Sequence, residues 1–277
     1  MINIKGVGEF FSLDIGTNAI RAIQLSKTGE NSWNLVGLGY VSVDPQLVVS
    51  ESEESRRKLG EVITTMIGQS DIKAKNVAIS KKKKKTFTTV IDVPIQDIKE
   101  LKRTMEYQLD QHIPMAIDDA KVDWVLLGES LTKPDSQEVL IASTAKNYSE
   151  GKLEFIENLG LNVIAAEPDS ISMSRSLASN YQGGQLIIDF GENSADLSML
   201  YNNAPRLVRT IPVGLGTLVK SAVQNLNIKE DQARQFILKF GLAQDKLDAQ
   251  VFRAIEVTLE NFAQEISKSI KFFSTKY

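Results

Sequence analysis

The sequence predicts an α/β protein of two domains, each built around a related strand-turn-strand unit. Its 277 residues suffice for about two domains of ordinary size. Strand-like and helix-like segments alternate along the chain. Residues 11–25 and 186–200 also follow one pattern, FSLDIGTNAIRAIQL and LIIDFGENSADLSML, at an offset of 175 positions. The repeat predicts two homologous halves that face each other across a cleft.

The composition excludes several classes of protein. A net charge of −3 disfavours a general nucleic-acid binder, which carries a basic excess. With no cysteine and one histidine, His112, the chain has neither a disulfide framework nor a multi-histidine or Cys-ligated zinc site. His112 follows an amphipathic helix and is expected to be a partly buried structural residue. The N-terminus lacks a secretory signal and no apolar run reaches ~18–20 residues, so a cytoplasmic protein without a membrane span is expected.

The first half predicts strands on both sides of the first turn, a strand at 33–43, a helix at 54–68 and a strand at 76–80. The block 81–159 then predicts a β-α-β-β-α order. Its strands are expected at 86–93, 121–128 and 138–145, and a helix between them ends before Pro114. Asn147 and Glu150 have the spacing of a capping box at the start of the next helix.

The run Lys81 to Lys85 is expected to form a solvated loop, with contact to anionic lipid as the less simple alternative. In the second half, apolar residues at helical spacing predict helices around 219–226 and 233–240, the latter closed by Gly241. The apolar spacing over 252–273 fits a coiled-coil seam or a core-facing helix, and its aromatic content favours the core.

The two turns have a chemical use. Glycine can adopt positive φ, which lets a turn direct several backbone N–H groups at one oxyanion. The carboxylates of Asp14 and Asp189, each at a strand end beside such a turn, could hold a hydrated Mg²⁺. Two opposed turns could bind the phosphates of a nucleotide from both sides. Two unrelated hairpins remain the alternative for either turn considered alone.

These turns resemble the two phosphate motifs of the actin, Hsp70 and sugar-kinase superfamily. AAEPDSISMSRSLASN at 165–180 is similar to its first connecting helix, which opens with Glu-Pro, and TIPVGLGTL at 210–218 to the glycine pair after the second phosphate hairpin. Within the superfamily the chain resembles the PilM family of type IV pilus assembly. SLDIGTNAIRAIQLSKTG at 12–29, FTTVIDVP at 87–94, MEYQLDQHIPMAIDDAKVDW at 105–124 and EVLIASTAKN at 138–147 carry this resemblance over nearly the whole chain.

The resemblance implies an actin-like (ribonuclease H-like) two-domain fold with an FtsA-like inserted subdomain. Residues 1–80 would begin the first actin-like domain, 81–159 form the insertion, 160–182 the connecting strand and helix, and 183–277 an incomplete second domain. Family members continue past the position of Tyr277 with a glycine-rich adenosine-binding segment and a last helix. Either the sequence is truncated or nucleotide binding is impaired. The five lysines replace a Pro/Ser-containing stretch of the family for no evident physical reason.

The resemblance also implies ATP and Mg²⁺ as cofactors, with Asp14 and Asp189 organising the metal's hydration shell. Glu167 would orient the attacking water, or would simply be an acid favoured by a helix N-terminus. Arg234 lies on the helix that contacts ribose or adenine in relatives, although an ordinary solvated arginine is the simpler expectation. Contacts to phosphate or ribose would come from Gly16, Thr17, Asn18, Gly191, Glu192, Asn193, Gly214 and Gly216.

Three functions are compatible with the sequence. The first is a nucleotide-responsive scaffold whose partner is the cytoplasmic N-terminal tail of the inner-membrane protein PilN, with other platform components or a second copy as further partners. It would lie at the inner membrane only through that partner, with at most slow ATPase activity. The second is a sugar or metabolite kinase, for which no catalytic acid beyond the turns is found. The third is an FtsA-like filament-forming ATPase. The scaffold is favoured.

Overall fold

The computed structural model describes residues 8–30, 32–81, 85–178 and 183–277. The chain divides into two compact units. Unit 1 comprises Met1–Phe87, Tyr107–Asp123 and Ala142–Ser172, and unit 2 comprises Thr88–Glu106, Trp124–Ile141 and Met173–Tyr277. The domain boundaries predicted from the sequence, including the insertion at 81–159, stay a prediction.

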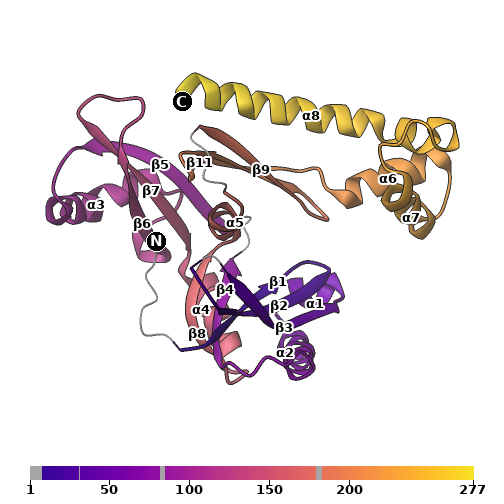
Figure 1. Cartoon of the computed structure of the whole chain (residues 1–277), viewed down its shortest axis with the longest axis horizontal. Helices are drawn as coiled ribbons and strands as arrows, with labels where there is room; N and C mark the ends of the chain where they lie inside the picture. The colour runs from indigo at the N-terminus through magenta and orange to yellow at the C-terminus, as the bar shows by residue number, and fades with distance from the viewer. Residues whose placement is uncertain (1–7, 31, 82–84, 179–182) are drawn as a thin grey trace. The chain divides into compact units, whose positions relative to one another are not determined.

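Unit 1 is built on a five-stranded sheet of order β3-β2-β1-β4-β8 (Figure 1). Antiparallel pairing joins β1 (Phe10–Ile15) to β2 (Ala19–Lys27) and β2 to β3 (Trp33–Ser42). The next two strands, β4 (Asn76–Lys81) and β8 (Asn162–Pro168), continue the sheet in parallel with β1. The carboxyl ends of β1, β4 and β8 therefore lie at one edge of the sheet.

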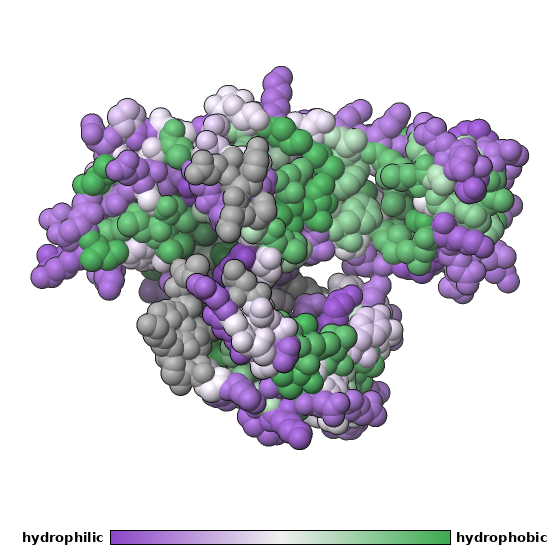
Figure 2. All heavy atoms as spheres, in the orientation of Figure 1, coloured by the Kyte–Doolittle hydropathy of each residue, from purple (hydrophilic) through white to green (hydrophobic). Residues whose placement is uncertain are grey.

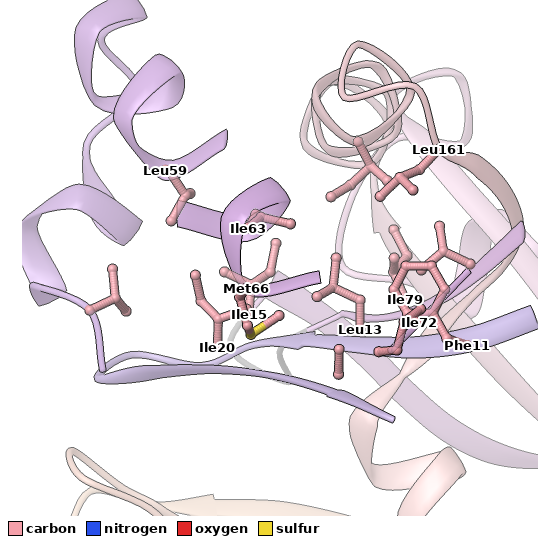
Figure 3. Close-up of a cluster of buried hydrophobic side chains, with 14 residues drawn as sticks. Phe11, Leu13, Ile15, Ile20, Leu59, Ile63, Met66, Ile72, Ile79 and Leu161 are labelled. Carbon is pink, nitrogen blue, oxygen red and sulfur yellow. The ribbon is translucent and has the colours of Figure 1, made fainter. Parts of the chain in front are cut away.

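One face of this sheet is the core of unit 1. Phe11, Leu13 and Ile15 alternate with Ser12 and Asp14 along β1, so the apolar side chains point to the same face. Figure 3 shows them packed with side chains of the helix α2 (Glu53–Gly68). The short helix α1 (Pro45–Val49) and α4 (Lys146–Glu157) complete the helical elements around this core. The period-two alternation thus determines which face of β1 carries Asp14.

The opposite face of β2 and β3 is also apolar but exposed. Trp33, Leu35, Leu38 and Tyr40 are each 58–64% exposed, and apolar side chains gather over these strands in Figure 2. A cation lies over an aromatic ring at each end of this face, with the Arg21 guanidinium 5.7 Å from the Tyr40 ring centroid. The amino group of Lys27 lies 5.9 Å from the centroid of the Trp33 ring.

The predicted β-α-β-β-α order is present. Its elements are β5 (Thr86–Pro94), α3 (Ile98–His112), the 3₁₀ turn η2 (Ile117–Asp119), β6 (Ala120–Glu129), β7 (Ser136–Ala145) and then α4. The three strands form a sheet of order β5-β7-β6. His112 is the last residue of α3 and is partly buried, as predicted.

Unit 2 contains an antiparallel sheet of order β11-β10-β9 and a cluster of three helices. The chain runs through α5 (Asp169–Leu177), β9 (Gly184–Phe190), β10 (Ala195–Tyr201), β11 (Ala204–Ile211), α6 (Leu215–Leu226), α7 (Glu230–Phe240), η3 (Leu247–Ala249) and α8 (Gln250–Lys276). Val251 and Ile255 of α8 are buried against α6 and α7. The core-facing interpretation of the long helix is therefore confirmed for its first half.

Two predicted helix starts are wrong. The Glu167-Pro168 pair ends β8 instead of opening a helix, and α5 begins at Asp169. The reason is local, because the residue before proline is biased toward extended backbone. No capping box forms at Asn147, since α4 begins at Lys146. The Asn147 side chain instead accepts a hydrogen bond of 2.7 Å from the Tyr148 amide.

The lysine run is not simply a solvated loop. Lys81 ends β4 and is buried, and its amino group donates a 2.6 Å hydrogen bond to the Ser149 hydroxyl. Burial lowers the pKa of Lys81, and the nearby Lys121 adds to this effect. Lys85 is exposed over the Tyr148 ring, while residues 82–84 lie outside the described residues. The prediction is therefore wrong for Lys81, whose place at the end of a core strand decides its burial.

Candidate functional site

The two turns repeat each other in backbone detail. Asp14 pairs with Arg21 across the first hairpin, and Asp189 pairs with Asp196 across the second, so the register is unchanged by the 175-residue shift. The Gly16 amide donates to the Ala19 carbonyl at 2.9 Å, and the equivalent Gly191 amide donates to the Ser194 carbonyl at 3.0 Å. The sequence repeat thus corresponds to two hairpins with the same turn and the same pairing.

The reason for glycine differs from the one predicted. Neither Gly16 nor Gly191 is among the described glycines with positive φ, so the expected left-handed turn is wrong. A Cβ atom on Gly16 would instead lie 2.7 Å from the Ala19 carbonyl oxygen, and one on Gly191 would lie 3.0 Å from that of Ser194. The first turn closes too tightly for a side chain at Gly16, whereas a side chain at Gly191 would require only a small shift of the Ser194 carbonyl.

Asp14 lies in a row of side-chain positions that crosses the sheet of unit 1. Strand pairing places Tyr40, Arg21 and Asp14 next to one another, and also Ser80 next to Glu167. The Ser80 hydroxyl connects these two groups of neighbours, because it donates a hydrogen bond of 3.2 Å to Asp14 Oδ1. The other carboxylate oxygen, Asp14 Oδ2, lies 3.2 Å from Arg21 Nη1. Asp14, Ser80 and Glu167 lie at the carboxyl ends of the parallel strands, which is the edge at which open α/β sheets bind ligands. Asp14 and Glu167 therefore share one edge of one sheet.

The sequence reasoning missed three members of this row, Tyr40, Arg21 and Ser80. Arg21 could have been found from the hairpin, because a four-residue turn after Ile15 places it opposite Asp14. Ser80 carries no local signal, since it is 66 residues from Asp14 in sequence. Lys152 is also near, with its amino group 2.6 Å from the Ser80 carbonyl oxygen. The row thus combines acidic, hydroxyl and basic groups.

Thr17 and Asn18 complete the first turn. The Asn18 carbonyl accepts a 3.0 Å hydrogen bond from the Val43 amide, which attaches the turn to the end of β3. Its side-chain oxygen is buried and has no hydrogen-bond partner within the described ranges. A buried acceptor of this kind is suited to a donor from a ligand or from metal-bound water.

The second turn is attached to the start of α6. The Gly191 and Glu192 carbonyls accept hydrogen bonds of 3.0 and 2.8 Å from the Leu215 and Gly216 amides. A Cβ atom on Gly214 would lie 2.6 Å from the Glu192 carbonyl oxygen, so glycine is required for this approach. Whether Gly214 and Gly216 also contact a nucleotide stays a prediction.

Arg234 holds the same turn from α7. Its two terminal nitrogens lie 3.0 and 2.5 Å from the two carboxylate oxygens of Glu192. Hydrogen bonding to Glu192 raises the pKa of Arg234. The expectation of an ordinary solvated arginine is therefore wrong, because the guanidinium forms a two-pronged ion pair. The Glu192 turn, the start of α6 and α7 thus form one connected assembly in unit 2.

The two turns differ in charge. In the first, the acid Asp14 is paired with Arg21, whereas in the second the exposed Asp189 lies across from another acid, Asp196. The Asp196 carboxylate accepts a hydrogen bond from the Thr210 hydroxyl. Asn193 is exposed within the second turn. The second turn is therefore the more acidic of the two.

The groups at each turn, taken separately, fit a hydrated Mg²⁺ and a phosphate better than a metal held only by protein. Across the described part of the chain, no three His, Cys, Asp or Glu residues gather as a metal cluster. Mg²⁺ keeps several waters and takes one or two carboxylates together with substrate phosphates. In unit 1, Asp14 supplies such a carboxylate and the buried Asn18 oxygen an acceptor for a water ligand; in unit 2, Asp189 supplies another carboxylate.

The fold and the paired turns define an α/β protein of the actin-like class. A family model described as type IV pilus assembly protein PilM matches residues 12–277, and the chain belongs to this family. It is similar to a solved structure entitled "PilM-PilN type IV pilus biogenesis complex", with 18% identity, 97% of this chain and 78% of that chain covered, and a TM-score of 0.78. It is also similar to the ethanolamine utilization protein EutJ from Carboxydothermus hydrogenoformans, with 13% identity, 98% and 74% coverage, and a TM-score of 0.55.

Among the helices that the structure describes, none has the length and hydropathy needed to cross a membrane.

Proposed function

We propose that this PilM-family protein is a nucleotide-binding scaffold of the type IV pilus inner-membrane platform. In this proposal both turns contribute to the binding of one Mg-ATP. The observation that supports it is the repeat of one tight acidic turn in the same register in each half of the chain. Backbone and carboxylate groups of this kind suit a metal-bound triphosphate.

The residues have separate roles in this proposal. The backbone of Gly16, Thr17 and Asn18, and that of Gly191, Glu192 and Asn193, contacts phosphate oxygens. Asp14 and Asp189 orient the water ligands of the metal, and Ser80 holds the Asp14 carboxylate through its 3.2 Å hydrogen bond. Bound Mg²⁺ supplies neutralisation of phosphate charge. Gly214, Gly216 and Arg234 position the second turn, and contact with the ribose or base is part of the same proposal.

Hydrolysis, if the nucleotide is turned over, is assigned to Glu167. Glu167 lies at the carboxyl edge of β8 beside Ser80, in the row that contains Asp14. A carboxylate at this position can accept a proton from an attacking water. Glu167→Gln removes the base and keeps the size, so we expect nucleotide affinity to persist while hydrolysis, which we expect to be slow, falls about a hundredfold or more.

The partner proposed for this scaffold is the cytoplasmic N-terminal tail of PilN. Membership of the PilM family and the likeness to a solved PilM-PilN complex support it. Such a partner would hold the chain at the inner membrane indirectly, and the nucleotide would change the affinity for the tail.

Calorimetric titration of Mg-ATP into the 277-residue protein tests nucleotide binding. We expect saturable binding that is lost in Asp14→Ala and Asp189→Ala and retained in Asp245→Ala, which removes an acid 73% exposed and distant in sequence from both turns. Retained affinity in both turn variants would refute the proposed site.

Partner binding is measured separately, by fluorescence anisotropy of a labelled PilN tail peptide with and without Mg-ATP. A scrambled peptide is the control. Binding of the peptide without any binding of Mg-ATP would leave a nucleotide-independent scaffold. Absence of binding to the authentic peptide would refute the partner proposal alone.

A further inference from the structure

Unit 2 contains a cavity of about 170 Å³ that is separate from both turns. It is lined by residues 88–90 of β5, residues 206–208 of β11 and the last turn of α8. Both β5 and β11 are edge strands of their sheets. The polar and charged members of the lining are Thr88, Thr89, Arg206, Lys276 and Tyr277. The volume equals on the order of ten water-sized positions, which is room for a small organic molecule.

Arg206 supplies a buried donor to this cavity. Its side chain is only 4% exposed, and its Nε lies 3.0 Å from Oε2 of the fully buried Glu138. The contact is an ion pair without hydrogen-bond geometry, because neither Nε nor Nη1 of Arg206, and neither carboxylate oxygen of Glu138, has a hydrogen-bond partner in the part of the chain that the structure describes. A buried guanidinium nitrogen without an acceptor is costly, so it marks a place where an acceptor is expected.

The charges around the cavity favour an anion. The two charged residues of the lining, Arg206 and Lys276, are cations, whereas the nearby acids Glu138 and Asp92 are not part of the lining. Burial raises the pKa of Glu138 and the negative charge of Asp92 adds to this effect, while the positive charges of Arg206 and Lys276 oppose it. Within the described part of the chain, two cations and no acidic side chain therefore border the cavity itself. The buried Tyr277 hydroxyl, which also has no partner among the described residues, adds a further donor.

We propose that this cavity binds the carboxylate group of a small organic acid. The carboxylate accepts hydrogen bonds from Arg206 Nη1 and from Lys276, and the hydroxyls of Thr88, Thr89 and Tyr277 surround it. The apolar part of the acid packs against Phe273 and the other apolar lining residues. This site is independent of nucleotide binding by the turns, so either proposal can fail without the other.

Calorimetric titration with sodium benzoate and sodium butyrate at constant ionic strength tests the site. Benzamide, which has the ring of benzoate without its charge, is the matched ligand control. We expect saturable binding of at least one acid and none of benzamide. Lys276→Gln removes a charge-assisted hydrogen bond and weakens binding about tenfold. Lys271→Gln removes the same charge from an exposed position of α8 outside the cavity lining and leaves affinity unchanged.

Several outcomes would overturn the inference. The first is that neither benzoate nor butyrate binds, although the circular dichroism spectrum and the melting curve show a folded protein. Equal binding of benzamide, or equal loss in both lysine variants, would show a site that does not recognise the carboxylate in this cavity. Arg206→Lys keeps the charge and removes the fork, so undiminished affinity in a folded Arg206→Lys protein would also refute the role of Arg206.

Discussion

The buried Arg206–Glu138 pair offers a sharp test of the energetics of unit 2. The two side chains are 4% and 0% exposed and come from β11 and β7. At their separation of 3.0 Å, Coulomb attraction is worth about 5 kcal/mol with an effective dielectric constant of ~20. Desolvation costs several kcal/mol for each ion, so attraction and desolvation nearly cancel. The pair is therefore expected to contribute little net stability.

The prediction follows from this near-cancellation. Glu138→Leu leaves Arg206 buried without its acid, and Arg206→Met leaves Glu138 without its cation, so each single variant should lose about 3–5 kcal/mol of unfolding free energy. The double variant removes both charges and fills the space with apolar atoms. Its stability should lie between unchanged and about 4 kcal/mol higher than that of the parent.

Urea unfolding followed by circular dichroism measures all four proteins of this double-mutant cycle. The midpoint and the slope should be compared together, because a change in slope would indicate that the two units unfold separately. The reasoning would be refuted if the double variant lost as much stability as the two single variants added together. That result would mean that the two side chains contribute through packing with their own neighbours and not through their mutual charge.

Three further predictions concern particular side chains. Gly214→Ala should destabilise the folded protein by about 1–3 kcal/mol in thermal or urea unfolding, because the new Cβ would lie 2.6 Å from the Glu192 carbonyl oxygen. The control variant Gly68→Ala should be neutral or slightly stabilising, because no atom lies within 4 Å of its Cβ. Arg234→Lys should lower the free energy of unfolding by roughly 1 kcal/mol, because lysine cannot form the two-pronged contact to Glu192. Arg57→Lys, in the exposed ion pair with Glu61, is the control and should change it by less than about 0.5 kcal/mol. Equal effects of the two substitutions would contradict the assigned geometry. Burial lowers the pKa of Lys81 in the folded state, so between that pKa and 10.5 the unfolded state binds more protons. The free energy of unfolding should therefore rise as the pH increases through this range. A Lys81→Met variant with the same rise would refute this cause.

Local patterns were sufficient for most of the elements. The matched hairpins at 11–25 and 186–200 were evident because the turn residues and the flanking alternation lie within fifteen positions of each other. Helices such as α2 and α3 follow from apolar spacing and from the proline after α3. Predictions that depended on one side chain at a helix start were weaker. Asn147 satisfies its neighbour's amide, and the Glu-Pro pair favours a strand end.

The alternating segments and the repeat by themselves determined the α/β class and the two acidic turns, and the spaced motifs of the sequence carried the resemblance to the PilM family. Tertiary structure alone decided that Ser80 and Glu167 share a sheet edge with Asp14, that Arg234 holds Glu192, and that Lys81 and Glu138 are buried. The physical reason is that sequence periodicity reports which face of an element is apolar. The order of strands in a sheet, and the group opposite each polar side chain, depend on packing between segments tens of residues apart.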